Sequence, residues 1–236
     1  MATQARVDPA PSVVVPALAT RAGAEMFGTA MLLAVIVGSG IMADNLATGN
    51  DAAKLFACAS ATGAALTVLI TILGPISGAH LNPAVSVVEL VRGGLKTSEF
   101  GAYVLAQIVG GLVGAVLAHA MFGMPLVSAF ADPRWGPAQW GSEVVATFGL
   151  LITILGCARR FPERTAALVG IYIFAAFWFT GSASFANPAV TIGRTLTASF
   201  TGIRPMDVLP FVLAQLAGGL LGLAVWRLLD GAEPRR

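Results

Sequence analysis

The sequence predicts an all-α membrane protein with six transmembrane helices and two half-helices arranged as an inverted repeat. Three observations predict this fold class. The chain of 236 residues is 56% hydrophobic and 11% charged, with a mean hydropathy of +0.81. Its apolar residues fall into long blocks, which is typical of membrane spans rather than of a soluble domain. One segment also occurs twice, as SGAHLNPAVS ending at Ser86 and as SASFANPAVT ending at Thr191.

The ends of the chain differ from this apolar body. Residues 1–20 alternate Ala, Pro, Val and polar residues. They lack the order of basic, apolar and cleavage-site segments that a signal peptide has, so we expect a disordered cytoplasmic arm. One membrane domain is expected over residues 21–230, followed by a cytoplasmic tail at residues 231–236.

Six apolar segments are expected to cross the membrane, because about 30 Å of hydrocarbon takes about 20 helical residues. They are residues 22–43, 53–73, 99–122, 141–158, 166–181 and 207–229. Ten of the fourteen basic residues fall on one side of this arrangement, which leaves Lys54, Arg134, Arg194 and Arg204 on the other. Since cytoplasmic loops carry the excess of Lys and Arg, both termini are expected in the cytoplasm.

Two further apolar runs, at residues 82–92 and 187–199, are too short to span a membrane. Each begins with Asn, Pro and Ala: Asn82, Pro83 and Ala84 in the first half, and Asn187, Pro188 and Ala189 in the second. Asn followed by Pro is typical of a helix N-terminus, where Pro lacks an N–H that would be unpaired in any case. Each of these two boxes is therefore expected to start a half-helix.

The two halves, about residues 21–122 and 141–230, resemble each other beyond the boxes. AEMFGTAMLLAVIVG from Ala24 matches SEVVATFGLLITILG from Ser142, and YVLAQIVGGLVG from Tyr103 is nearly repeated as FVLAQLAGGLLG from Phe211. Such similarity indicates a duplication. Because each half has three spans, the second half must lie upside down relative to the first, so the two half-helices meet at the midplane.

This meeting point implies a water-filled path, because non-helical backbone in a membrane must be buried in protein or line a polar cavity. Helix N-termini bring partial positive charge to its centre, and the amides of Asn82 and Asn187 can donate hydrogen bonds to a solute. Small neutral solutes are therefore favoured over cations. Backbone carbonyls before each box can act as acceptors: Gly78, Ala79, His80 and Leu81, and Ala183, Ser184, Phe185 and Ala186.

The paired NPA boxes, the segment GAHLNPAVS and the repeated AQxxGGLxG helices resemble the aquaporin and aquaglyceroporin family over about residues 21–230. The resemblance implies an aquaporin-like fold and a homotetramer with one pore per subunit. Together with the apolar spans, it places the chain as a multi-pass protein in the lipid of a bacterial inner membrane. It implies no cofactor.

Two acids, Glu25 and Glu143, lie within expected spans at matching points of the repeat. An acid inside a membrane is a candidate for a proton relay. The favoured interpretation is structural, namely that both carboxylates accept hydrogen bonds from the unpaired N–H groups of the box loops, and the resemblance implies the same role. Gln107 and Gln215 are interpreted as loop-holding residues, with pore lining as the alternative. His80 is expected to brace its loop rather than to gate by protonation.

The family's selectivity constriction has four positions, which the resemblance places at Thr62, Ala175, Ser184 and Val190. Water-selective members carry an aromatic residue, a His and an Arg there, and glycerol channels keep aromatic residues and the Arg. This chain has none of them at these positions, so we expect a wide, more apolar filter. Arg194 lies one helical turn beyond Val190. It is interpreted as a charge at the outer end of the half-helix, with an outer constriction as the alternative.

The expected function is a passive channel for water and small uncharged solutes, with a filter suited to glycerol, urea or neutral metalloid hydroxides such as arsenite. In this respect the chain is similar to bacterial family members that lack the filter Arg, some of which are associated with arsenic handling. A narrow water channel using Arg194 and an ion-coupled secondary transporter are the alternatives. The sequence places no nucleophile, base and orienting group together, so no enzyme is expected. The net charge of +2 does not favour nucleic-acid binding, and Cys58 and Cys157 lack metal-ligand spacing.

Overall fold

The computed structural model of the chain describes residues 15–128 and 131–231. Residues 1–14 of the expected arm and residues 232–236 of the expected tail lie outside this range. Residues 18–20 were expected in the arm but belong to the first helix. The reason is Arg21, which donates to the Pro16 carbonyl at 3.1 Å and pairs with Glu99 at 2.7 Å, so that the start of the helix is fixed.

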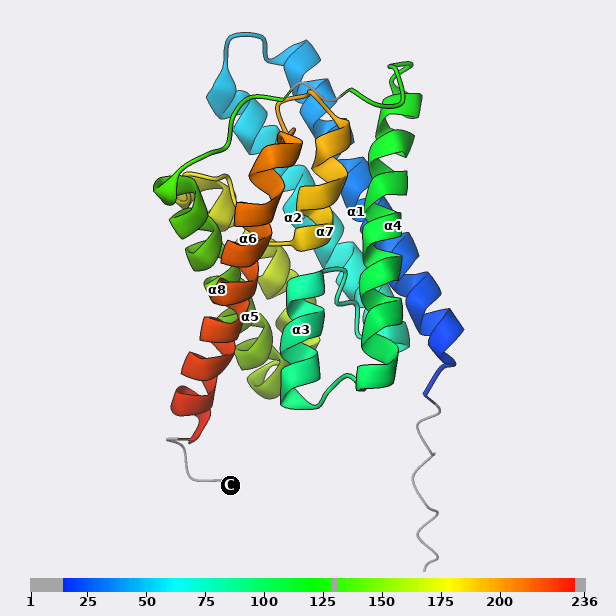
Figure 1. Cartoon of the computed structure of the whole chain (residues 1–236), viewed down its shortest axis with the longest axis vertical. Coiled ribbons are helices and arrows are strands. Elements are labelled where there is room, and N and C mark those ends of the chain that lie inside the picture. Colours follow the sequence, from blue (N-terminus) through cyan, green and yellow to red (C-terminus); the bar gives the residue numbers. More distant parts are fainter. Residues whose placement is uncertain (1–14, 129–130, 232–236) are drawn as a thin grey trace, which may run out of the picture.

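The described residues form eight α-helices and two short 3₁₀ turns, with the expected arrangement of six long helices and two half-helices (Figure 1). The helices are α1 (Leu18–Leu46), α2 (Asp51–Ser77), α3 (Pro83–Arg92), α4 (Thr97–Met121), α5 (Pro137–Arg160), α6 (Thr165–Phe179), α7 (Pro188–Gly193) and α8 (Pro205–Gly231), and the turns are η1 (Pro162–Arg164) and η2 (Arg194–Leu196). Five of these helices are long and apolar enough to cross a membrane by length and composition; α6 has 15 residues.

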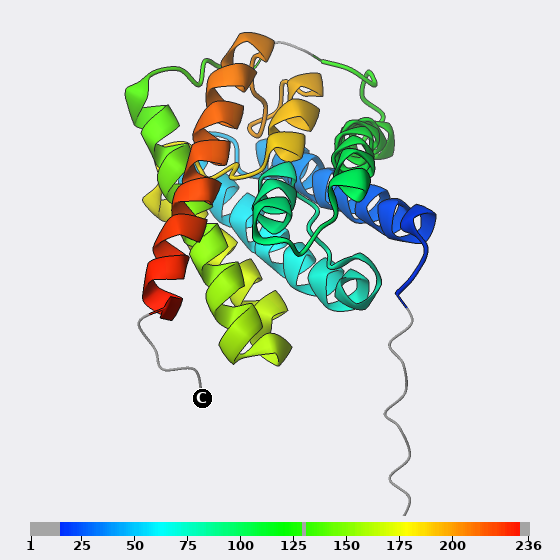
Figure 2. The same ribbon diagram turned by 60° about the horizontal axis from the view of Figure 1, so that its bottom comes forward.

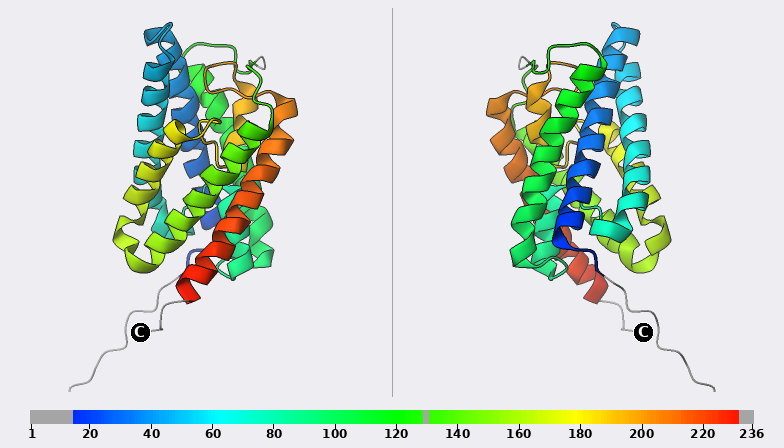
Figure 3. Two further views of the ribbon diagram at one scale, coloured as in Figure 1. Left: turned by 90° about the vertical axis from the view of Figure 1, so that its left-hand side faces the viewer. Right: turned by 90° about the vertical axis from the view of Figure 1, so that its right-hand side faces the viewer.

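The half-helices α3 and α7 lie one above the other in the middle of the bundle (Figure 1). Figure 2 shows α1 and α4 on one side of α3, and α5 and α8 on the other. The chain enters α1 and leaves α8 at the same end of the bundle (Figure 3), which we call the terminal end. We call the other end, which carries residues 47–50 and 197–204, the loop end.

Close helix pairs repeat in the two halves, as a duplication requires. A Cβ atom added at Gly114 of α4 would come 2.1 Å from the Ala30 carbonyl oxygen of α1. In the second half, a Cβ atom at Gly218 of α8 would come 2.3 Å from the Val144 carbonyl oxygen of α5. Small residues therefore let α1 meet α4, and α5 meet α8, at backbone distance. These two rigid pairs support the half-helices between them.

The outer surface of the bundle carries large apolar side chains. Leu105 of α4 and its repeat partner Leu213 of α8 are 64% and 58% exposed, and Ile171 of α6 is 61% exposed. Apolar area of this extent on several helices is what a hydrocarbon environment accommodates. The chain is therefore a multi-pass membrane protein.

The second half-helix is shorter than its expected range of 187–199. It ends at Gly193, and the chain then tightens into η2 and turns back. The Arg194 carbonyl accepts hydrogen bonds from Thr197 N at 3.5 Å and from Ile203 N at 3.3 Å, which closes this return. The half-helix is shorter than expected because residues beyond Gly193 form backbone hydrogen bonds within the loop rather than along a helix. This early end of α7 determines where the Arg194 side chain lies.

Candidate pore and its constriction

The two boxes meet in the middle of the molecule through their asparagines. Asn82 donates from Nδ2 to the Ala186 carbonyl at 2.8 Å, and Asn187 donates from Nδ2 to the Leu81 carbonyl at 2.8 Å. Each Oδ1 atom also caps its own half-helix, accepting from Ala84 N or Ala189 N at 2.9 Å. A side-chain amide has two N–H bonds. These contacts therefore use only one N–H bond of each asparagine amide, at the meeting point of two helix N-termini.

The loops before the boxes are held in an uncommon backbone conformation. Among the described residues, five that are not glycine have positive φ, and all five lie in these loops: Ala79, Leu81, Ala183, Ser184 and Ala186, with φ between 47° and 57°. The left-handed conformation costs about 1–2 kcal/mol per residue outside glycine. It persists only where surrounding contacts impose it, so each loop requires a strong hydrogen-bonding partner.

Glu25 of α1 is that partner for the first loop. Its fully buried carboxylate accepts hydrogen bonds from Ser77 Oγ at 2.7 Å, His80 N at 2.9 Å and Leu81 N at 2.6 Å. A fourth hydrogen bond comes from Gln107 Nε2 of α4 at 2.8 Å. Four donors occupy the acceptor sites of the Glu25 carboxylate, and these contacts support the predicted role of Glu25 in bracing the loop.

Glu143 of α5 does the same for the second loop. It accepts from Ser182 Oγ at 2.6 Å, Phe185 N at 2.9 Å, Ala186 N at 2.8 Å and Gln215 Nε2 at 2.6 Å. In all four of these hydrogen bonds the carboxylate is the acceptor, and two of the donors are backbone N–H groups of the loop. The contacts therefore support loop bracing rather than proton relay for both acids.

Aromatic contacts follow the same internal symmetry. His80 of the first loop lies 5.2 Å from the ring of Tyr103, and its Nδ1 is 3.0 Å from Ser86 Oγ. At the matching place in the second loop, the Phe185 ring lies 5.3 Å from Phe211. His80 is thus fixed on two sides, which supports its interpretation as a bracing residue.

A cavity runs past both boxes and offers about 60 Å³ for the centres of water molecules. One water needs about 10–15 Å³ on this measure, so the cavity holds a short file of waters. Part of its lining comes from the box loops, namely Ala79, His80, Leu81 and Asn82, and Ser184, Phe185, Ala186 and Asn187. Apolar side chains of the long helices also line it: Leu32 and Ile36 of α1, Leu66 and Ile70 of α2, Leu150 and Ile154 of α5, and Ile173 of α6. Gly78 and Ala183, expected to offer carbonyls, are not part of the lining.

Three of the four expected constriction residues, Thr62, Ser184 and Val190, line the cavity. Ala175 does not, and that expectation is wrong, because Ala175 is exposed on the outer face of α6. Residues on a helix are rotated by about 100° per position, so residues 173 and 177 share a face that residue 175 does not. Ile173 and Phe177 are buried and line the cavity instead.

Arg194 also lines the cavity, and its side chain is not the exposed outer charge of the favoured interpretation. The residue is 2% exposed. Its Nε donates to the Thr201 carbonyl, and its Cζ lies 3.4 Å from the centre of the Phe185 ring. Phe177 and Arg194 together correct the expectation of a filter without aromatic or cationic groups. The apolar stripe of Val169, Ile173 and Phe177 was the signal for Phe177. The spacing of one helical turn from Val190 was the signal for Arg194, which the sequence offered as an outer constriction only as the alternative interpretation.

Similarity to known proteins agrees with this geometry. The family model "MIP: Major intrinsic protein" matches residues 15–183. Aquaglyceroporin AqpS of Rhizobium meliloti (strain 1021) is 53% identical over 218 residues, which cover 92% of this chain and 93% of that protein. Aquaporin-8 of Mus musculus is 34% identical over 193 residues, covering 75% of this chain and 72% of that protein.

The X-ray structure of the aquaglyceroporin from Plasmodium falciparum matches with a TM-score of 0.71, covering 92% of this chain and 97% of that one. At 21% sequence identity this similarity shows the fold alone. The family match and the extent of identity to AqpS carry the assignment, and the paired boxes at the centre of the cavity agree with it. This chain belongs to the major intrinsic protein family.

Proposed function

We propose that this chain is a passive channel for water and small uncharged solutes, with glycerol-like polyols as the preferred class. Its family indicates a channel rather than an enzyme. The observation that carries the solute class is the mixed lining of the cavity, which combines the box loops with apolar side chains of α1, α2, α5 and α6. A polyol carries both hydroxyl groups and carbon atoms along its length, so it can contact both kinds of lining. Urea and neutral metalloid hydroxides such as arsenite belong to the same range of sizes and are included.

The constriction proposed for this channel consists of Thr62, Phe177, Ser184, Val190 and Arg194. Phe177 and Arg194 make it narrower than a filter of small residues alone, while Val190 keeps part of its surface apolar. This combination supports polyol passage over strict water selectivity. The printed name of its relative AqpS, an aquaglyceroporin, supports the same solute class.

Cation exclusion is proposed to arise at the boxes. Both half-helices direct their N-termini, with about half a positive charge each, towards the middle of the cavity. Asn82 and Asn187 present N–H donors at the same place. A neutral solute can accept these hydrogen bonds, whereas a cation meets only positive ends and loses its water.

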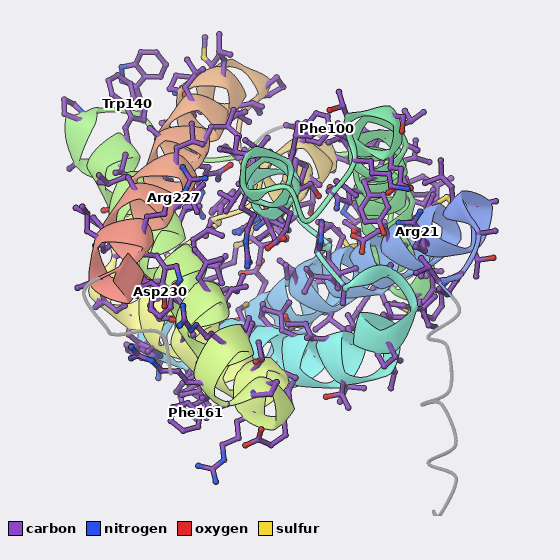
Figure 4. The ribbon with its side chains drawn as sticks, turned by 90° about the horizontal axis from the view of Figure 1, so that it is seen from below. Arg21, Phe100, Trp140, Phe161, Arg227 and Asp230 are labelled. Atoms are coloured by element: carbon purple, nitrogen blue, oxygen red, sulfur yellow. The ribbon has the colours of Figure 1, made fainter. Side chains whose placement is uncertain are left out.

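The location and assembly are proposed on separate grounds. Arg21 and Arg227 lie at the terminal end of the bundle, seen from below in Figure 4. Arg92, Arg159 and Arg164 close helices or turns at the same end. By the positive-inside rule this end faces the cytoplasm, so both termini are proposed to be cytoplasmic in a bacterial inner membrane. A homotetramer with one pore per subunit is proposed from family membership.

Stopped-flow light scattering on proteoliposomes tests the proposed solute class. Vesicles with the purified protein are compared with protein-free vesicles for permeability to water, glycerol, urea and neutral arsenite. We expect glycerol permeability to rise at least about tenfold, since lowering a barrier by 1.36 kcal/mol changes a rate tenfold. Water permeability without any added glycerol, urea or arsenite permeability would contradict the proposal.

The asparagine of the second box offers a test of cation exclusion. In an Asn187→Asp protein, a carboxylate replaces the donor to Leu81 O and introduces negative charge between two helix N-termini. Cation conductance should increase at least about tenfold, because a negative charge beside the path of the cation lowers the barrier to its passage by more than about 1.36 kcal/mol. Potassium flux into proteoliposomes measures it, with Asn45→Asp at the loop end as the control. If Asn187→Asp inserts correctly and stays as tight to potassium as the unmutated protein, the boxes do not exclude cations.

A further inference from the structure

Arg194 is a buried cation at the loop-end side of the cavity, one helical turn beyond the valine that also lines it. We propose that Arg194, and not residue 190, supplies the positive charge and the hydrogen-bond donors of the channel's constriction. This inference rests on the proposed function, a channel for neutral solutes. It adds a specificity-determining residue whose place in the chain is set by the return of the backbone after α7.

The Arg194 guanidinium has no carboxylate partner. Within residues 15–128 and 131–231, no Asp or Glu oxygen lies within ion-pair distance of its nitrogens. An unpaired buried charge is strongly destabilising unless other groups replace its water. A cation placed here for structure alone would be expected to have an acid beside it, as Arg204 has Asp207 at 2.9 Å.

Two contacts replace part of the lost hydration. The Phe185 ring lies against the guanidinium, with 3.4 Å between the ring centre and Cζ, and such a desolvated cation–π contact is attractive. The Thr201 carbonyl accepts from Nε. Both Nη atoms lack a hydrogen bond to any described residue. Since Arg194 lines the cavity, its Nη donors are available to water and to the oxygen atoms of a solute.

The loop that holds Thr201 is itself fixed from two directions. Arg134 donates from Nε to the Gly202 carbonyl at 2.8 Å and from Nη2 to the Phe200 carbonyl at 3.1 Å. Asp44 of α1 accepts from Phe200 N at 2.8 Å and pairs with Lys54 at 3.0 Å. A guanidinium whose supporting carbonyl is held in this way keeps one position, which a selective constriction requires.

The matching residue of the first repeat does something different. Glu89 occupies the place in α3 that Arg194 occupies after α7, seven residues beyond its asparagine. It pairs with Arg92 at 3.0 Å near the helix end and does not line the cavity. The inward Arg194 is therefore no by-product of the duplication. It follows from the early end of α7 at Gly193 and the turn that comes after it.

The test compares three variants with the unmutated protein in proteoliposomes: Arg194→Met, the exchange variant Arg194→Val with Val190→Arg, and the control Arg164→Met. Arg164 suits the control because its side chain is 69% exposed beside Glu163. Urea and glycerol permeability and potassium leak are measured in each. Arg194→Met should raise urea permeability and potassium leak about tenfold, which corresponds to 1.36 kcal/mol of barrier. The exchange variant should return both towards the values of the unmutated protein, and Arg164→Met should leave both unchanged.

Each outcome has a distinct meaning. If the unmutated protein passes no neutral solute above protein-free vesicles, the proposed function fails. If it passes glycerol, but Arg194→Met matches it in urea permeability and potassium leak, the proposed role of Arg194 is overturned and the channel stands. Should Arg194→Met not insert, Arg194→Lys decides, because it keeps the charge but loses the planar donors. If the Arg194→Lys protein still excludes potassium but its urea permeability differs from that of the unmutated protein, the inference is supported. If its urea permeability is unchanged, the inference is contradicted.

Discussion

Replacing Glu143 with Ala should give the largest loss of stability of any single substitution discussed for this chain. Four buried donors lose their shared acceptor. Each unsatisfied buried donor costs about 1–3 kcal/mol. Ser184 and Ala186 would also lose the restraint that holds them at φ 48°. Most of the variant should be aggregated or unfolded after extraction, which thermal unfolding and gel filtration in detergent measure.

Two companion substitutions sharpen this prediction. Glu143→Gln keeps one acceptor oxygen but directs an NH₂ group at the remaining donors, so its unfolding temperature should fall between those of Glu143→Ala and the unmutated protein. Glu163→Ala removes an acid that is 66% exposed and should leave the unfolding temperature unchanged. A Glu143→Ala protein with the same unfolding temperature as the unmutated protein would show that the loop is held by other contacts.

Val190→Arg should close the channel to glycerol. Val190 is 2% exposed and lines the cavity together with Arg194, so a second guanidinium would enter a cavity that offers only about 60 Å³ to the centres of water molecules. The added side chain narrows the passage, and two like charges at short distance cost about 1–4 kcal/mol at the dielectric of a wet protein surface. Glycerol permeability should fall at least about tenfold and water permeability less, because the wider solute meets the greater obstruction.

Stopped-flow traces of water and glycerol from the same vesicles give this ratio directly. Val127→Arg is the matched control, since Val127 is 53% exposed in the loop before residue 129 and an arginine there has room in solvent. Equal losses of water and glycerol permeability in Val190→Arg would indicate a misfolded protein. Unchanged glycerol permeability would contradict the position assigned to the constriction.

The repeat made much of this architecture predictable. A box that opens a short apolar run predicts a half-helix, and an odd number of spans per half predicts that the two boxes meet. The same symmetry predicts paired roles for Glu25 and Glu143, because matching acids lie beside matching loops whose N–H groups require acceptors. The structure confirms the fold and supplies the hydrogen bonds that support these roles.

The constriction could not be predicted to the same degree. The family resemblance places one constriction position at Ala175, but the rotation of α6 about its axis is set by the burial of Val169, Ile173 and Phe177. The inward position of Arg194 depends on backbone contacts between residues 194 and 203 and on Arg134, which comes from a distant loop. The spacing from Val190 allows an inward Arg194 as one of two alternatives, but the tertiary contacts that select this position leave no local pattern in the chain.

Glycerol accumulation in proteoliposomes under an imposed proton gradient tests the central claim most directly. Radiolabelled glycerol inside and outside the vesicles is measured to equilibrium, with and without the gradient. A passive pore braced by Glu25 and Glu143 predicts fast uptake that stops at equal concentrations, whatever the gradient. Accumulation above the outside concentration that collapses with a proton ionophore would contradict it, and would identify the buried acids as part of a proton-coupled transporter.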